Sequence, residues 1–205
     1  MSLDAIAVLG EPARRAVYEF VVAGSQPVSR NEVADGVGIG RTLAAFHLDK
    51  LVEAGLLEVS YAPRVGGPGA GRPAKLYRRS SAEHAMALPP REYRLLAGIL
   101  AAAVEQAGAE PAAYAVAREH GAKLAQGDVL EQLRALGYEP VDGGDSTVRL
   151  RNCPFHATAQ AYPPLVCGLN LALLEGLIGG GGHVARLEPG PTGCCVAITC
   201  KNNFD

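Results

Sequence analysis

The sequence predicts an α+β chain in three parts, and three observations support that prediction. Residues 27–79 hold two short helical patterns joined by a glycine-bearing turn and followed by two strand-like runs. The next stretch is dominated by apolar and small residues at helical spacing, and the last 70 residues alternate short strands with one apolar helix. We therefore expect one domain at residues 1–80, a helical linker or dimerisation region at 81–136, and a small α+β domain at 137–205.

The first domain is expected to begin with three helices. One runs from about Glu11 to Val22, and a short one follows at about Ser29 to Asp35, where the first residue and Glu32 are spaced as a capping box. The third lies between Gly40, which can serve as its N-cap, and Gly55, which can end it. The sequence VGIG joins the last two helices tightly. Two short helices joined in this way form a helix-turn-helix pattern.

The third helix has two different faces. Its apolar residues recur at roughly helical spacing and predict a core-facing stripe: Ile39, Ala44, Leu48 and Leu51. The other face holds the candidate DNA contacts: Arg41, Thr42, Ala45, Phe46 and Lys50. Small and polar groups at the start of such a helix suit close approach to base edges. We expect His47, on the same helix, to be buried or to face a phosphate.

Two strand-like runs, LLEVSYAPR and AKLYRRS, follow directly and are joined by the glycine-rich loop VGGPGAGRP. A hairpin in this position is a wing. It carries five basic residues and no acidic ones from Arg64 onward: Arg64, Arg72, Lys75, Arg78 and Arg79. Because its glycines let backbone approach a phosphate closely, Arg64, Arg72 and Lys75 are further candidate DNA contacts.

Residues 8–79 resemble the winged-helix domain of ArsR-type bacterial transcriptional regulators. The likeness is carried by the helix near Glu11-Pro12, the run NEVADGVGIGRTLAAFHLDKLVEAGLLE and the wing sequence GRPAKLY. It implies that the helix from Ile39 to Leu51 enters the major groove of a double-stranded DNA operator. The alternative is a winged helix used only for protein contacts.

Charge is distributed unevenly along a chain whose net charge is −2. Residues 1–80 carry 10 basic and 8 acidic side chains, whereas residues 81–205 carry 9 and 13. This asymmetry is expected when only one end of a protein meets DNA. The first residues do not resemble a signal peptide, and no apolar run approaches the 18 residues of a membrane span. We therefore expect a cytoplasmic protein.

The middle part is expected to be helical. Four apolar residues from Tyr93 to Val104 lie at near-helical spacing, among small residues that permit close helix packing. A helix in this position commonly mediates dimerisation in winged-helix regulators, so the resemblance implies a homodimer. Packing inside its own subunit is the alternative. Further helices are expected at about Glu110 to Leu124 and Asp128 to Leu136.

The last part is expected to form a small sheet crossed by one helix. A hairpin turns at Asp142 to Asp145, and a buried helix runs from Leu165 to Ile178 before the run GGGG. The segments HVARLEP and CCVAITC then predict two closing strands.

This part contains all five cysteines: Cys153, Cys167, Cys194, Cys195 and Cys200. In a cytosolic protein, clustered cysteines indicate metal, cluster or redox chemistry more often than disulfide staples. There is no CxxC pair, so an ordinary zinc ribbon is poorly supported. Thiolates brought together by the fold suit an iron–sulfur cluster, which needs three or four such ligands. Small buried thiols without any site are the alternative.

This half resembles the C-terminal domain of SufR-like iron–sulfur repressors through NCPFH at 152–156, PPLVCGLNLALLEGL at 163–177 and GCCV at 193–196. The resemblance implies Cys153, Cys167 and one of Cys194 or Cys195 as cluster ligands, with Cys195 favoured by its spacing. The family pattern has another cysteine between the positions of Cys167 and Cys195, where this chain offers only a histidine. A fourth ligand would therefore come from outside the protein or from this set: Cys194, Cys200, His156 and His183.

Two expectations concern the cysteines near the end of the chain. Adjacent strand residues face opposite ways, so only one of Cys194 and Cys195 should point at the site. Cys200 lies five residues beyond Cys195. It should lie roughly 16 Å further along an extended strand and be structural.

These features together predict a dimeric DNA-binding transcriptional regulator whose C-terminal domain senses iron–sulfur or redox state. A regulator that binds another metal, or a small organic effector between the C-terminal helix and sheet, is the alternative. A thiol-dependent enzyme centred on Cys153 and His156 is a competing class. No motif brings a nucleophile, a base and an orienting acid together, so we expect no enzyme.

Overall fold

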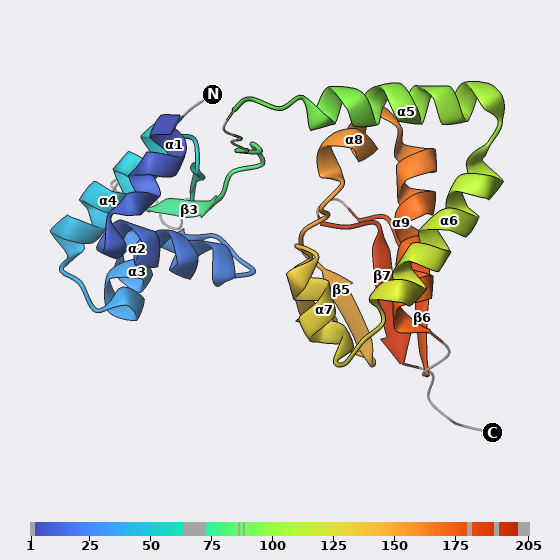
Figure 1. Ribbon diagram of the computed structural model, residues 1–205. Coiled ribbons are helices and arrows are strands. Elements are labelled where there is room, and N and C mark those ends of the chain that lie inside the picture. The colour runs from blue at the N-terminus through green and yellow to red at the C-terminus, as the bar shows by residue number, and fades with distance from the viewer. Residues whose placement is uncertain are drawn as a thin grey trace. The chain divides into compact units, whose positions relative to one another are not determined.

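The chain forms two compact units, Met1–Arg91 and Glu92–Asp205 (Figure 1). The structure, a computed structural model, describes residues 3–63, 73–85, 87, 89–179, 182–190 and 193–200. Each unit combines helices with one antiparallel sheet, so the predicted α+β class is confirmed. The unit boundary falls at 91/92, whereas the sequence predicted boundaries at 80/81 and 136/137.

The N-terminal unit contains four α-helices, one 3-10 turn and a three-stranded sheet among the described residues. The helical elements are α1 (Leu3–Ala7), η1 (Val8–Gly10), α2 (Pro12–Ala23), α3 (Arg30–Val37) and α4 (Arg41–Glu53). The strands are β1 (Val28–Ser29), β2 (Leu57–Tyr61) and β3 (Lys75–Arg79), in the order β1-β3-β2.

Local signals in the sequence account for the ends of α3 and α4. The Ser29 hydroxyl accepts a hydrogen bond from the Glu32 amide, and the Glu32 carboxylate accepts one from the Ser29 amide, so the predicted capping box is present. Gly38 ends α3 with a φ of 73°, a left-handed conformation that glycine adopts cheaply. Gly40 is the N-cap of α4, as predicted.

Buried aliphatic side chains hold these helices together. Ala44, Leu48 and Leu51 of α4 are fully buried, and they belong to one core with Val17 of α2 and Val33 of α3. Strands β2 and β3 pair in register as the predicted hairpin, with Val59 opposite Tyr77. Tyr77 is buried, so the hairpin is attached to the core through its inner face.

The C-terminal unit contains five α-helices and a four-stranded sheet among the described residues. The helices are α5 (Tyr93–Ala107), α6 (Glu110–Leu124), α7 (Val129–Ala135), α8 (His156–Ala161) and α9 (Pro163–Ile178). The strands are β4 (Pro140–Asp142), β5 (Thr147–Leu150), β6 (His183–Leu187) and β7 (Val196–Cys200), all antiparallel, in the order β4-β5-β7-β6.

Helix α9 is the centre of this unit, because it packs against the sheet and also against α6 (Figure 1). Glycines bring the backbones of α6 and α9 into direct contact. A Cβ atom added at Gly176 would lie 2.0 Å from the carbonyl oxygen of Arg118, and one added at Gly121 would lie 1.9 Å from that of Leu173. The helices predicted as a separate linker region therefore include one that is built into the C-terminal unit.

Two details near the cysteines differ from the sequence-based expectation. The segment NCPFH does not extend β5, which ends at Leu150; it leads instead into α8, a helix that the alternation pattern did not predict. Helix α9 begins at Pro163, two residues earlier than expected, because proline is favoured in a first helical turn. Cys167 is therefore the fifth residue of α9. It lies beyond the first turn, and the helix dipole acts most strongly within that turn.

Candidate DNA-binding face and cysteine cluster

The face of α4 that was predicted to meet DNA lies on the surface of the N-terminal unit. Arg41, Thr42 and Phe46 are exposed, and Phe46 keeps 53% of its surface accessible. Ala45 and Lys50 are half-buried. An aromatic side chain so exposed on a short helix has not been used for the core, so it remains available for a partner.

His47 belongs to the core and is absent from that face. Its side chain is buried, and its Nδ1 lies 3.7 Å from the Glu11 carboxylate. Neither ring nitrogen has a hydrogen-bond partner among the described residues. Of the two expectations for this histidine, the buried one is confirmed.

Two of the basic residues predicted to contact DNA form ion pairs within the protein. The Lys50 ammonium lies 2.7 Å from the Glu53 carboxylate, and the Lys75 ammonium lies 3.5 Å from that of Asp49. The second pair joins the base of the wing to α4. Pairs this exposed contribute little to stability, so a DNA phosphate could replace either carboxylate at small cost. Arg64 and Arg72, the other wing candidates, lie outside the described residues.

A pocket of about 330 Å³ lies where the start of α3 meets β3. It is lined by Ser29, Arg30, Asn31, Pro73, Ala74, Lys75 and Tyr77. Arg30 and Asn31 were not among the predicted contacts, although their position in the first turn of a helix-turn-helix was a usable signal. In such domains the first helix crosses the DNA backbone.

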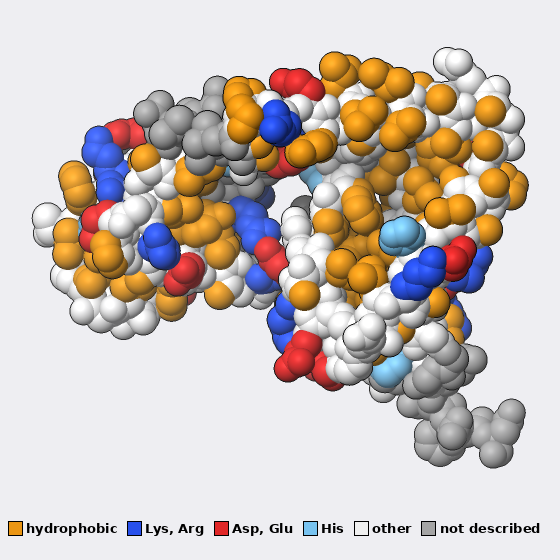
Figure 2. Space-filling view, viewed as in Figure 1, with side chains coloured by type: hydrophobic (Ala, Val, Ile, Leu, Met, Phe, Trp, Pro, Cys, Tyr) orange, Lys and Arg blue, Asp and Glu red, His pale blue; other side chains and the backbone are white. Residues whose placement is uncertain are grey.

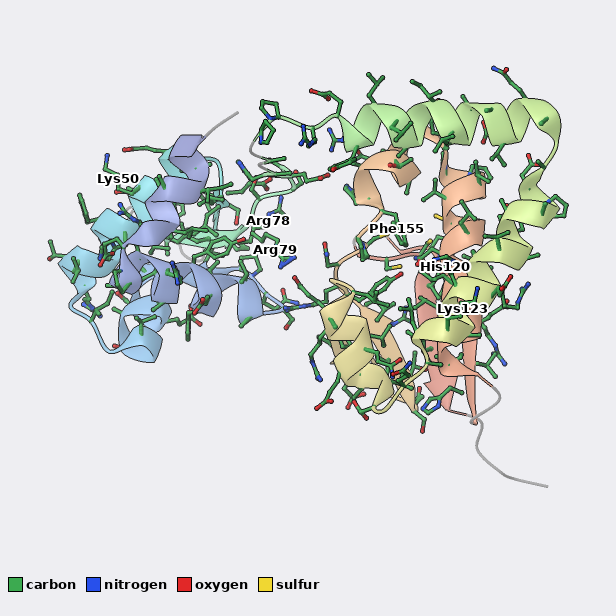
Figure 3. The ribbon with its side chains drawn as sticks, in the orientation of Figure 1. Lys50, Arg78, Arg79, His120, Lys123 and Phe155 are labelled. Carbon is green, nitrogen blue, oxygen red and sulfur yellow. The ribbon has the colours of Figure 1, made fainter. Side chains whose placement is uncertain are left out.

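In the C-terminal unit, three separate segments bring four cysteine thiols together. Cys153 lies in the loop after β5, Cys167 lies on α9, and Cys194 and Cys195 directly precede β7. The thiols contact one another in a chain: Cys153 with Cys194, Cys194 with Cys195, and Cys195 with Cys167. Figure 3 shows sulfur atoms gathered beside α9.

The expectation that only one of Cys194 and Cys195 would bind a metal stays a prediction, but the structural reason for it does not hold. Both precede β7, so the alternation of side chains along a strand does not apply to them. Cys200 is paired with His183 at the far end of β7, as the spacing along the strand predicted, and nothing is described of its side chain.

Cys194 is the most enclosed of the four thiols. Its sulfur accepts hydrogen bonds from Asn170 Nδ2 at 3.0 Å and from the Val196 amide at 3.5 Å. The Tyr138 hydroxyl donates to Asn170 Oδ1 and so turns the Asn170 N–H groups toward the sulfur. Asn170 and Tyr138 are buried. Sequence reasoning missed both, although a single Asn within the apolar run LVCGLNLALLEGL was a visible signal.

Contacts among the thiols shift their pKa values in opposite directions. A hydrogen bond from the Cys153 thiol, with those from Val196 and Asn170, holds the pKa of Cys194 below its ordinary value. The same hydrogen bond, with burial, raises the pKa of Cys153. Burial and the contact with Cys167 raise the pKa of Cys195. The cluster therefore favours a thiolate at Cys194 over one at Cys153 or Cys195.

Four cysteine thiols are a suitable donor set for iron, because thiolates are the usual ligands of iron–sulfur clusters. Their arrangement is a chain, and among the described residues no three His, Cys, Asp or Glu side chains are grouped to hold one metal ion. The two histidines that were candidates for a fourth ligand have contacts other than the four clustered thiols. His156 is exposed and contacts Gln160 at 3.1 Å, and His183 lies opposite Cys200.

Residues 9–60 match a family described as a helix-turn-helix domain. No curated protein matches the chain. The matched segment runs from η1 to β2, so it contains α3, α4 and all the candidate contacts on α4. This helix-turn-helix domain supports a DNA-binding regulator of the winged-helix kind, and β3 supplies the second strand of the wing.

Helix α5 presents two apolar faces. Ala97, Leu100, Ala101 and Val104 face the rest of the C-terminal unit, where they line an apolar pocket of about 350 Å³ with residues of α6, α8 and α9. Another face exposes large side chains to solvent: Tyr93, Leu95, Leu96 and Ile99. Figure 2 shows hydrophobic side chains along this helix. No helix in the described part of the chain is long and apolar enough to span a bilayer.

Proposed function

We propose that this protein is a cytoplasmic, homodimeric transcriptional regulator whose C-terminal unit senses iron–sulfur cluster or redox state. The DNA-binding half is supported by the helix-turn-helix domain at residues 9–60 and by the exposed residues of α4. The observation that carries the sensing half is the gathering of four thiols: Cys153, Cys167, Cys194 and Cys195.

On DNA, α4 occupies the major groove of an operator half-site. Arg41, Thr42 and Phe46 face the base edges from its exposed side. Lys50 and Lys75 exchange their carboxylate partners for phosphates, and Arg64 and Arg72 of the wing contact the backbone. Two subunits bind half-sites about one helical turn apart, because a symmetric dimer places its two reading helices on one side of the duplex.

The exposed row on α5 supports the homodimer. Leu95, Leu96 and Ile99 recur at the three- and four-residue spacing that forms a stripe on a helix. A stripe of this kind is costly to leave in water. A second copy covers it by bringing its own α5 alongside.

The cysteines couple to DNA binding by linkage. A bound iron–sulfur cluster, held by Cys153, Cys167, Cys195 and Cys194, would supply iron whose loss or oxidation reports on the cell's state. The cysteines on α9 and on the loops beside β5 and β7 would then take different positions in the protein with the cluster and in the protein without it. Such coupling is typically worth about 1–3 kcal/mol in affinity for DNA.

The apolar pocket between α5, α6, α8 and α9 favours a second candidate. An uncharged organic effector there would contact α5 directly, and so could change the dimer. This position differs from the predicted one between the C-terminal helix and the sheet. It requires no cluster.

Anaerobic purification tests the proposal. We expect visible thiolate-to-iron absorption and matching iron and sulfide contents. We also expect affinity for the operator to change when the iron is removed. Cys153→Ser and Cys167→Ser should abolish iron binding, with Cys200→Ser as the matched control that retains it. Full iron and sulfide in Cys153→Ser would refute the ligand set, and colourless protein with unchanged thiols would leave the effector pocket as the better explanation.

A further inference from the structure

The chain of thiols contains three contacts, and they are not chemically equivalent. The middle contact joins Cys194 to Cys195, which are neighbours in sequence. A disulfide between neighbours closes a small ring that the trans peptide bond resists. The two outer contacts carry no such restriction: Cys153 with Cys194, and Cys195 with Cys167. Together they use each of the four thiols once.

We propose that, without a cluster, the four cysteines are two dithiol pairs, Cys153–Cys194 and Cys167–Cys195, each of which a peroxide closes to a disulfide. For its biological use this rests on the proposed sensing function. Its chemistry rests only on which sulfurs are in contact.

The surroundings of the first pair assign a role to each sulfur. Asn170 Nδ2 and the Val196 amide both donate to the Cys194 sulfur, so that sulfur is the electron-rich partner. Cys153 is its neighbour and is less deeply buried, which gives a small oxidant a route to the pair. Tyr138 keeps the amide of Asn170 in its donating orientation. Asn170 is therefore a positioning residue for the first pair.

The reaction balances with peroxide as the only oxidant. The Cys194 sulfur attacks one peroxide oxygen, the O–O bond breaks, and the leaving hydroxide takes the thiol proton to form water. The Cys153 sulfur then attacks the resulting sulfenic acid, the S–O bond breaks, and a second water leaves. Two thiols have lost two electrons and two protons, and the peroxide has been reduced to water. Cys195 and Cys167 react in the same way.

The two disulfides would tie three segments together, because one joins the loop after β5 to the start of β7 and the other joins α9 to that same start. They would also consume the four thiols proposed as cluster ligands. A disulfide sulfur cannot serve as a thiolate ligand. The oxidised protein is therefore unable to take up iron until it is reduced.

The test uses the iron-free 205-residue chain, prepared anaerobically and treated with hydrogen peroxide. Free thiols are then alkylated in denaturant, and peptides are mapped without reduction. Because Cys194 and Cys195 share a peptide, single variants resolve the pairing. Cys195→Ser should retain the link between Cys153 and Cys194 and leave Cys167 alkylated. Cys194→Ser should retain the link between Cys167 and Cys195 and leave Cys153 alkylated.

Three outcomes would overturn the pairing: a link between Cys153 and Cys167, a link between Cys153 and Cys195 in Cys194→Ser, or four alkylated thiols after peroxide. Asn170→Leu removes the N–H donor, and it should slow closure of the first pair about tenfold, the effect of one lost hydrogen bond. The second pair, which lacks that contact, should close at its original rate. If Asn170→Leu does not fold, Tyr138→Phe tests the same orientation more mildly.

Failure of this inference is separable from failure of the proposed function. Disulfide mapping involves neither iron nor DNA. Iron binding without peroxide-driven disulfide formation would refute the inference but would still support the proposed iron–sulfur sensor. Correct pairing in a protein that never binds iron would leave redox state as the sensed signal.

Discussion

At the scale of single residues, buried or partly buried polar groups in this protein act through defined hydrogen bonds. Glu58 shows this in the N-terminal unit. Its carboxylate accepts hydrogen bonds from the Ser81 amide at 3.0 Å and from Arg78 Nη2 at 2.9 Å. The Ser81 amide, followed by the Arg78 side chain, lowers the pKa of Glu58 below its ordinary value of 4.5. One carboxylate thus connects β2, β3 and the segment after the hairpin.

The first prediction concerns this carboxylate and pH. Because the pKa of Glu58 is lower in the folded state, its contribution to stability is present above pH 4.5 and is lost as the pH falls through the folded value. Glu58→Gln should therefore reduce stability at neutral pH and flatten its decline below that value. Denaturant unfolding of both proteins from neutral to acid pH measures the difference. Glu105→Gln, a change on the exposed side of α5, is the control; an equally flattened curve there would remove Glu58 as the cause.

At the scale of secondary-structure elements, the contact between α6 and α9 determines the architecture of the C-terminal unit. Glycines at the crossing let the two backbones touch, so that α9 is covered by the sheet on one side and by α6 on another. The cysteine cluster depends on this, because α9 carries both Cys167 and Asn170.

The second prediction replaces these glycines. Gly176→Ala places a methyl group against the backbone of α6, and backbone cannot rotate away, so we expect a loss of about 3 kcal/mol, the upper part of the range for overpacking. Gly98→Ala on α5 is the matched control, because nothing lies within 4 Å of its Cβ position and helix propensity favours alanine there. Chemical denaturation compares the two. Equal stabilities would mean that α6 and α9 are not in backbone contact.

At the scale of the whole molecule, the proposed function uses the exposed face of α4 to bind DNA and the apolar row on α5 to form the dimer. The chain separates them into different units, which suits a protein that binds DNA with one and assembles through the other.

The third prediction concerns DNA. Arg72→Ala should weaken operator binding and lower the salt slope by about one, as for the loss of one phosphate contact. Arg41→Ala should instead alter sequence preference, because Arg41 lies on the exposed side of α4. Binding titrations at several salt concentrations measure both effects. Lys123→Ala removes a comparable charge from the C-terminal unit and should change neither. Unchanged binding in both arginine variants would contradict the arrangement of wing and reading helix.

The fourth prediction concerns assembly. Ile99→Glu introduces a charge into the apolar row of α5, so the homodimer should dissociate and affinity for a two-half-site operator should fall. Sedimentation velocity measures the first effect. Leu187→Glu is the control, since Leu187 is also exposed but lies on β6. A dimer that survives Ile99→Glu would place the interface elsewhere.

Much of the fold could be predicted because its signals are local. The capping box at Ser29 and Glu32, the glycine after α3 and the extent of α6 depend on a few neighbouring residues, and the structure agrees with each. Apolar spacing along α4 separated the core from the exposed face in the same way. The matched helix-turn-helix domain lies in this region, where periodicity and turn residues carry most of the information.

What only the tertiary structure decided are contacts between residues far apart in the chain. Sequence by itself determined that Cys167 lies on the apolar helix and that Cys200 lies on the last strand. It could not show that Cys153 contacts Cys194, that both Cys194 and Cys195 enter the cluster, or that Asn170 donates to a sulfur. Nor could it show that Gly121 of α6 and Gly176 of α9 each lie against the backbone of the other helix. No local period encodes such contacts, because they depend on how α9 packs against the sheet and against α6.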